Sequence, residues 1–211
     1  MSFEPLILCD SVARHAYVAI PKAACNSVLA AWEGYLGLAP QPGVPRTERS
    51  WPCVGPAREH LARFSGLRWT VVRNPWERLV SVWAAFLRDP PLYVRERLRK
   101  YNPHLHPYVG RPFSEFAEGV CLPDVATTGD RHCRAMSWFV TWEGRTVVDW
   151  AIPTDKLNSC WPLFERVGFP PIGHENKTEH QPYQEYYRPS LRDTVGAAYA
   201  EDVERFGFRF E

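Results

Sequence analysis

Residues 17–27 read Tyr17-Val18-Ala19-Ile20-Pro21-Lys22-Ala23-Ala24-Cys25-Asn26-Ser27, a short apolar strand that runs through a turn into a helix. A second junction of this kind reads Trp69-Thr70-Val71-Val72-Arg73-Asn74-Pro75-Trp76-Glu77-Arg78-Leu79-Val80-Ser81. Each turn carries a cation. A helix N-terminus offers unpaired N–H groups and the positive end of a dipole, so each junction predicts an anion site.

Strands and helices alternate around these junctions. Strands are expected at 17–20, 69–72 and 146–152, and helices at 26–37, 57–64, 76–88, 92–101, 155–167 and 189–206. This alternation predicts an α/β fold with a mainly parallel central sheet flanked by helices, in a single domain over residues 1–211. Ligands of such folds bind at the carboxyl ends of the strands, where both junctions lie.

The composition limits the possible partners. The 25 basic and 24 acidic side chains leave a net charge of +1, which argues against a general nucleic-acid surface. No apolar run approaches the roughly 18–20 residues of a membrane span, so stable membrane insertion is not expected. The six cysteines are scattered without a Cys-x-x-Cys pair, which favours reduced thiols and a cytoplasmic location.

The first junction has the residue types of a phosphate loop. Small residues let a ligand approach the backbone, Lys22 supplies a mobile charge, and Asn26 and Ser27 add side-chain donors. The alternative is an ordinary capped helix after a strand. The candidate binding residues are Lys22, Ala23, Ala24, Cys25, Asn26 and Ser27.

Two common nucleotide motifs are absent from the sequence. A Walker A loop needs Gly-x-x-x-x-Gly-Lys-Ser/Thr, but the first glycine is Gly34 and no Gly-Lys pair occurs. The Gly-x-Gly core of the dinucleotide fingerprint is missing as well. These absences disfavour nucleoside triphosphate hydrolysis and NAD chemistry.

The second junction places Arg73 directly after a strand and Ser81 eight residues later on a helix. At about 100° per residue, Ser81 lies away from the apolar stripe of that helix. The stripe comprises Trp76, Leu79, Val80, Trp83, Phe86 and Leu87. Two alternatives remain: Arg73 as a structural ion-pair partner and Ser81 as a surface serine.

Together the junctions resemble the sulfotransferase superfamily that uses 3′-phosphoadenosine 5′-phosphosulfate (PAPS), and most closely its carbohydrate, Golgi-type members. In that family a Pro-Lys loop holds the 5′-phosphosulfate, and an Arg followed eight residues later by Ser holds the 3′-phosphate. Residues 72–81 match the second pattern closely. Weaker likeness continues at 130–132, 176–178, 183–187 and 199–208.

The resemblance implies a P-loop-NTPase-like sulfotransferase fold and a role for each matched residue. Lys22 would assist sulfuryl transfer, and backbone N–H groups at 24–27 would cradle the 5′-phosphate. Arg73 and Ser81 would hold the 3′-phosphate, with Lys177 as an additional candidate. No metal is required. Asn26 departs from the hydroxyl residue usual in the family, which leaves a catalytically impaired nucleotide-binding module as one alternative.

A catalytic base must remove the acceptor proton. His132 is the candidate because its near-neutral pKa suits proton abstraction, and a buried structural histidine is the competing interpretation. Asp130 could orient His132 only if the backbone turns between them. A zinc site that includes His132 fits no standard ligand spacing. The alternative bases are His104, His106, Glu179 and His180.

The acceptor implied by the resemblance is a hydroxyl of a carbohydrate or another small molecule. Residues 40–56 and 89–136 are long enough to form an acceptor cleft or a lid. The aromatic residues belong to the core or line a sugar or adenine pocket. A basic run either attracts an acidic glycan or is a solvated helix face; it comprises Arg95, Arg97, Arg99 and Lys100. A phosphotransferase (kinase) on a related fold is the alternative enzyme.

Overall fold

The computed structural model describes residues 4–10, 12, 14–39, 41, 43–52, 54, 58–121, 123–125, 130–173, 175 and 178–211. The chain forms two compact units. The sheet unit comprises Met1–Val72 and Phe139–Lys177, and the helical unit comprises Arg73–Trp138 and Thr178–Glu211. The single domain over 1–211 stays a prediction.

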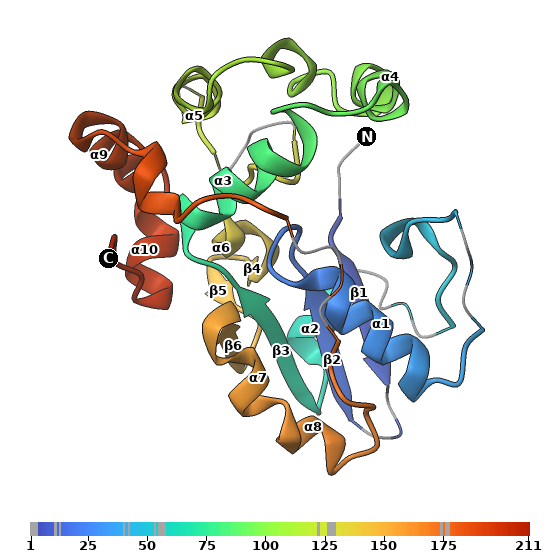
Figure 1. The fold of residues 1–211 in the computed structure, drawn as a ribbon. Coiled ribbons are helices and arrows are strands. Elements are labelled where there is room, and N and C mark those ends of the chain that lie inside the picture. Colours follow the sequence, from blue (N-terminus) through green and yellow to red (C-terminus); the bar gives the residue numbers. More distant parts are fainter. Residues whose placement is uncertain are drawn as a thin grey trace. The chain divides into compact units, whose positions relative to one another are not determined.

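A four-stranded sheet in the order β1-β2-β3-β6 forms the centre of the sheet unit (Figure 1). β2 (His15–Ala19) pairs in parallel with β3 (Leu67–Val72), and β3 pairs in parallel with β6 (Trp150–Pro153). The mainly parallel sheet is therefore confirmed. β1 (Leu6–Asp10), which pairs antiparallel with β2, was missed because this short strand begins with three apolar residues and has no alternating pattern.

Helices flank this sheet, and an aromatic core lies on one of its faces. Tyr17 of β2 and Trp69 of β3 lie with ring centroids 4.6 Å apart, and Phe164 lies 4.3 Å from Trp69. Trp32 belongs to the same buried cluster, so these aromatic residues form core rather than a ligand pocket. The unit contains α1 (Cys25–Tyr35), η1 (Arg46–Glu48), α2 (Arg58–Arg63), the β4 (Thr141–Trp142) and β5 (Arg145–Thr146) hairpin, η3 (Thr154–Lys156), α7 (Leu157–Cys160) and α8 (Pro162–Glu165).

The structure corrects two predictions in the sheet unit. The strand predicted at 146–152 is divided between β5 and β6, because Thr146 pairs with Thr141 of β4 whereas Trp150 pairs with Trp69 of β3. The helix predicted at 155–167 is divided into η3, α7 and α8. Pro162 occupies the first position of α8, where its missing N–H is tolerated.

The helical unit is built around α3 (Pro75–Phe86), whose predicted stripe packs with residues of α5 (Phe113–Cys121) and α9 (Pro189–Ala198) and is buried except for the partly buried Phe86. The helix predicted at 189–206 breaks at Tyr199, whose hydroxyl donates to the Cys133 carbonyl oxygen. The unit also contains α4 (Leu92–Tyr101), η2 (His106–Tyr108), α5 (Phe113–Cys121), α6 (Met136–Phe139, its last residue in the sheet unit), η4 (Tyr183–Tyr186), α9 (Pro189–Ala198) and α10 (Ala200–Phe206).

Candidate functional site

The turn of the first junction has an unusual backbone. β2 ends at Ala19 and α1 begins at Cys25, and between them Lys22 and Ala24 have φ angles of 65° and 53°. A left-handed conformation costs an L-residue roughly 1–2 kcal/mol. Such outliers concentrate at functional sites, so this turn is a functional candidate on geometry alone.

The N-terminus of α1 is not capped by a side chain. Its N-cap residue is Ala24, whose methyl group cannot accept a hydrogen bond, and the first turn contains no acidic residue. No side-chain cap therefore occupies the N–H groups at this helix start, as expected of a helix N-terminus that binds an anion. Lys22, Ala24 and Asn26 are half-buried, whereas Ala23 and Cys25 are buried. The alternative of an ordinary side-chain-capped helix is not supported.

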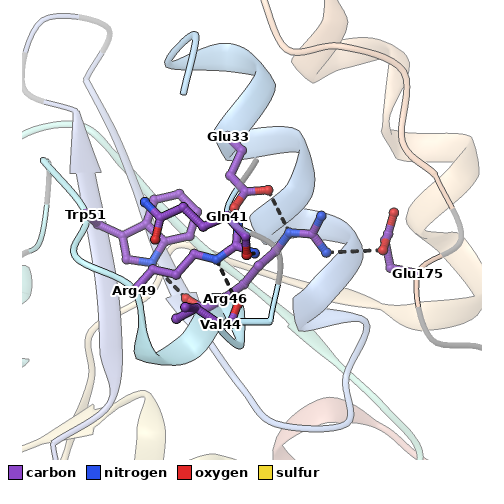
Figure 2. Close-up of polar contacts among 7 residues, drawn as sticks. All are labelled: Glu33, Gln41, Val44, Arg46, Arg49, Trp51 and Glu175. Carbon is purple, nitrogen blue, oxygen red and sulfur yellow. Dashed lines mark hydrogen bonds and ion pairs between the residues drawn. The ribbon is translucent and has the colours of Figure 1, made fainter. Parts of the chain in front are cut away.

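Ser27 is used by the protein itself. Its Oγ accepts a hydrogen bond from the Glu175 backbone N–H at 3.0 Å, and the Glu175 carboxylate lies 3.1 Å from Arg46 Nη1. Figure 2 shows that Arg46 also reaches Glu33 of α1, which pairs with Arg49 as well. Described parts of the predicted 40–56 loop are thus anchored to α1, and the Ser27 hydroxyl, which only accepts in this contact, can still donate its own proton to a ligand.

The second junction is capped by its own side chains. Asn74 is the N-cap of α3, and its Oδ1 accepts from the Trp76 N–H at 3.1 Å. Arg73 Nη2 donates to Glu77 Oε1 at 2.8 Å, and the Arg73 backbone N–H donates to the Met136 sulfur at 3.4 Å. The ion pair anticipated for Arg73 is therefore present, and the guanidinium charge of Arg73 is paired with the Glu77 carboxylate.

Ser81 is buried at 2% exposure, so it is not a surface serine. Residues four apart in a helix are neighbours on its surface. Glu77 pairs with Arg73 and lies four residues before Ser81. The Glu77 carboxylate and the Ser81 hydroxyl therefore lie on the same face of α3.

His132 is coupled to Asp130 by a tight turn. The Asp130 carbonyl oxygen accepts from the N–H groups of Cys133 and Arg134 at 3.2 and 3.1 Å. This turn brings Asp130 Oδ1 to 2.8 Å from the His132 N–H and 2.9 Å from His132 Nδ1. The ring of Phe86 packs edge-on against the imidazole at 5.0 Å. The turn required for Asp130 to orient His132 is thus present.

The Asp130 carboxylate stays ionised in spite of its burial. Burial raises the pKa of Asp130, but hydrogen bonds and charge interaction with His132, together with a hydrogen bond from Asn102, outweigh that effect. The net result is a pKa below the ordinary aspartate value. Since an ionised carboxylate only accepts hydrogen bonds, His132 Nδ1 carries the proton and Nε2 carries the lone pair of the neutral ring.

A family model described as "Sulfotransferase family" matches residues 9–209. The chain belongs to the sulfotransferase family. This match confirms the predicted enzyme class and agrees with the α/β fold, and it covers both junctions and the Asp130–His132 turn. Searches of curated proteins and of solved structures found no match.

The remaining predicted site residues of this sulfotransferase are dispersed or not described. Lys177 lies outside the described residues. His104 is exposed, and His180 Nδ1 lies 2.7 Å from the Gln181 carbonyl oxygen, so neither has a carboxylate partner like that of His132 among the hydrogen bonds of the described chain.

No helix in the described part of the chain combines the length and apolar character needed to cross a bilayer.

Sequence reasoning missed two buried charged residues of the sulfotransferase. Arg78 of α3 donates from Nη1 to the Arg134 carbonyl oxygen at 2.7 Å. The Asp202 carboxylate accepts from the N–H groups of Met136 and Ser137, both at 2.7 Å. Together they support the segment that follows His132. The available sequence signal was the apolar Val82, which is four residues from Arg78 and therefore on the same helix face.

Proposed function

We propose that this sulfotransferase moves a sulfuryl group from PAPS to a hydroxyl of a carbohydrate or another small acceptor. The observation that carries the proposal is the strained, uncapped turn at Lys22 and Ala24, which supplies backbone donors and a cation at one helix start. The Arg73 to Ser81 pattern supports a second anionic group on the same ligand.

Each matched residue then has a chemical task. N–H groups at the start of α1 hold the 5′-phosphate, and Lys22 stabilises negative charge on the bridging oxygen as its bond to sulfur breaks. Arg73 binds the 3′-phosphate through charge-assisted hydrogen bonds, and Ser81 adds a hydroxyl. Lys177 remains an additional candidate for the donor phosphates.

The sulfuryl group is transferred directly from PAPS to the acceptor, so the reaction needs one base and forms no covalent enzyme intermediate. The acceptor oxygen forms a bond to sulfur while the bond from sulfur to the bridging phosphate oxygen breaks. The electron pair of that bond stays on the phosphate, giving adenosine 3′,5′-bisphosphate. The acceptor proton passes to His132 Nε2, and the resulting imidazolium is stabilised by Asp130.

The surface of α4 supports an acidic carbohydrate as the acceptor. Tyr93 and Tyr101 are 72% and 63% exposed, and flat aromatic faces suit sugar rings. Arg97 and Lys100 are exposed on the same helix, and Lys100 Nζ lies 4.9 Å from the centre of the Tyr101 ring. Cations beside exposed aromatic rings fit a ligand that carries both sugar rings and negative charge.

Calorimetry with adenosine 3′,5′-bisphosphate tests the donor assignment directly. We expect binding that exceeds that of ATP and adenosine 5′-phosphate, because only the bisphosphate has a 3′-phosphate for Arg73. A panel in which ATP binds better would favour the phosphotransferase, and absence of bisphosphate binding would refute the proposal. Transfer of labelled sulfate to acidic glycans, compared with neutral ones, then tests the acceptor.

A further inference from the structure

Asn102, at the end of α4, contacts the carboxylate that orients the candidate base. Its Nδ2 donates to Asp130 Oδ2 at 2.8 Å, while Oδ1 of the same carboxylate serves His132. Asp130 is 2% exposed. Each carboxylate oxygen therefore has its own side-chain partner, and the plane of the carboxylate is fixed from both ends.

The backbone around Asn102 holds its side chain in place. The Asn102 N–H donates to the Leu98 carbonyl oxygen at 2.8 Å. Its own carbonyl oxygen accepts from the N–H groups of Leu105 and His106 at 2.9 and 3.2 Å. An amide anchored in this way donates a hydrogen bond to Asp130 without adding charge. It therefore fixes the orientation of the carboxylate and leaves the negative charge of Asp130 to stabilise an imidazolium at His132.

We propose that Asn102 is a positioning residue for His132 and acts through Asp130. By fixing the carboxylate, Asn102 keeps the proton of the neutral imidazole on Nδ1 and the lone pair on Nε2, the nitrogen that receives the acceptor proton. The catalytic consequence rests on the proposed function, whereas the three-residue hydrogen-bonded chain does not.

A ring-nitrogen NMR measurement tests the chain without any turnover. The protein is labelled with ¹⁵N-histidine, and the His132 signals are identified from their loss in His132→Gln. In the unaltered protein we expect a protonated Nδ1 and an unprotonated Nε2. In Asn102→Ala we expect a mixture of tautomers. A dominant Nε2–H tautomer in the unaltered protein, or an unchanged Nδ1–H tautomer in Asn102→Ala, would overturn the proposal.

Kinetics then separates positioning from a merely structural effect. We expect Asn102→Ala to lower kcat about tenfold with little change in KM, since only the alignment of the base is impaired. In a His132→Gln background the same substitution should lower kcat no further, because its effect passes through His132. A further loss in that background would show that Asn102 acts by another route.

Two variants keep the test decisive. Asn102→Ser retains a donor and should recover part of the lost kcat; recovery no better than Asn102→Ala would count against the proposal, and this variant replaces Asn102→Ala if the latter does not fold. Asn158→Ala, at an exposed position of α7, controls for loss of an asparagine. If the bisphosphate does not bind but the tautomer responds as expected, the proposed function fails while the hydrogen-bonded chain stands.

Discussion

The two strand-to-helix junctions look alike in sequence but are built differently. At the first, Ala24 provides no side-chain cap for α1 and two non-glycine residues adopt positive φ, so anion binding there would rest on the backbone. At the second, the Asn74 side chain caps α3 and Arg73 is paired with Glu77. Anion binding at this junction would therefore rest on side chains and not on the backbone N–H groups.

This difference separates two ways of binding an anion. A backbone site depends on conformation. Substitutions that disfavour positive φ should therefore lower its anion affinity more than the loss of any one donor side chain. A side-chain site depends on the guanidinium and hydroxyl, and its affinity is set by competition with Glu77. Substitutions at each junction distinguish these two ways of binding.

The largest effect is expected from Lys22→Ala, which removes the charge that stabilises the leaving phosphate. We expect kcat to fall by about 10²–10³, the range for loss of one group that stabilises transition-state charge. Bisphosphate affinity, measured by calorimetry, should change much less because the backbone donors remain. Lys156→Ala, an exposed lysine in η3, is the control. An equal loss of binding and turnover would mean that Lys22 serves the ground state.

Next in size is Arg73→Ala. We expect bisphosphate affinity to fall about 30- to 100-fold, or roughly 2–3 kcal/mol for a lost hydrogen-bonded charge partner. Adenosine 5′-phosphate, which lacks the 3′-phosphate, should bind equally to both proteins. If both nucleotides lost affinity equally, the assignment of Arg73 to the 3′-phosphate would be wrong.

The backbone character of the first junction is tested by Ala24→Val. A β-branched residue fits poorly at φ 53°, so we expect the free energy of unfolding to fall by about 1–3 kcal/mol. Urea denaturation measures this change. Ala30→Val, in the interior of α1, is the matched control and should cost less than about 1 kcal/mol. Equal losses would remove the evidence for strain at Ala24.

The smallest effect should come from Glu77→Gln, which frees Arg73 from its carboxylate at the second junction. We expect bisphosphate affinity to rise about two- to fivefold, because this partly exposed ion pair is worth only about 0.5–1 kcal/mol. The gain should vanish in the Arg73→Ala background. A loss of affinity would instead indicate that Glu77 holds Arg73 in its binding conformation.

The sequence was sufficient to predict the junctions, the parallel strands and the stripe of α3, because these depend on local apolar patterns and on proline at helix starts. It could not predict β1, a short strand without an alternating pattern, or the division of residues 146–167 into short elements. Both failures arise where tertiary packing decides between local alternatives.

The candidate site was predicted unevenly for a similar reason. The turn linking Asp130 to His132 was recognised as a condition, but Asn102 lies 28 residues before Asp130 and no sequence pattern joins them. Likewise, the Ser27 hydroxyl accepts from the N–H of Glu175, 148 residues away, and no local pattern joins these two residues. Such contacts follow from tertiary structure, which a local pattern does not encode.

The buried Asp202 carboxylate gives the stability of this enzyme an unusual response to acid. Burial raises the pKa of Asp202, so its ionisation opposes folding and this penalty is relieved as the pH falls through the raised pKa. Asp130, with its lowered pKa, stabilises the fold above the ordinary aspartate value, and that contribution is lost as the pH falls through its folded-state pKa. As the pH falls, protonation of Asp202, which contacts Met136 and Ser137, therefore first removes a destabilising charge. Protonation of Asp130 at lower pH then removes a stabilising one.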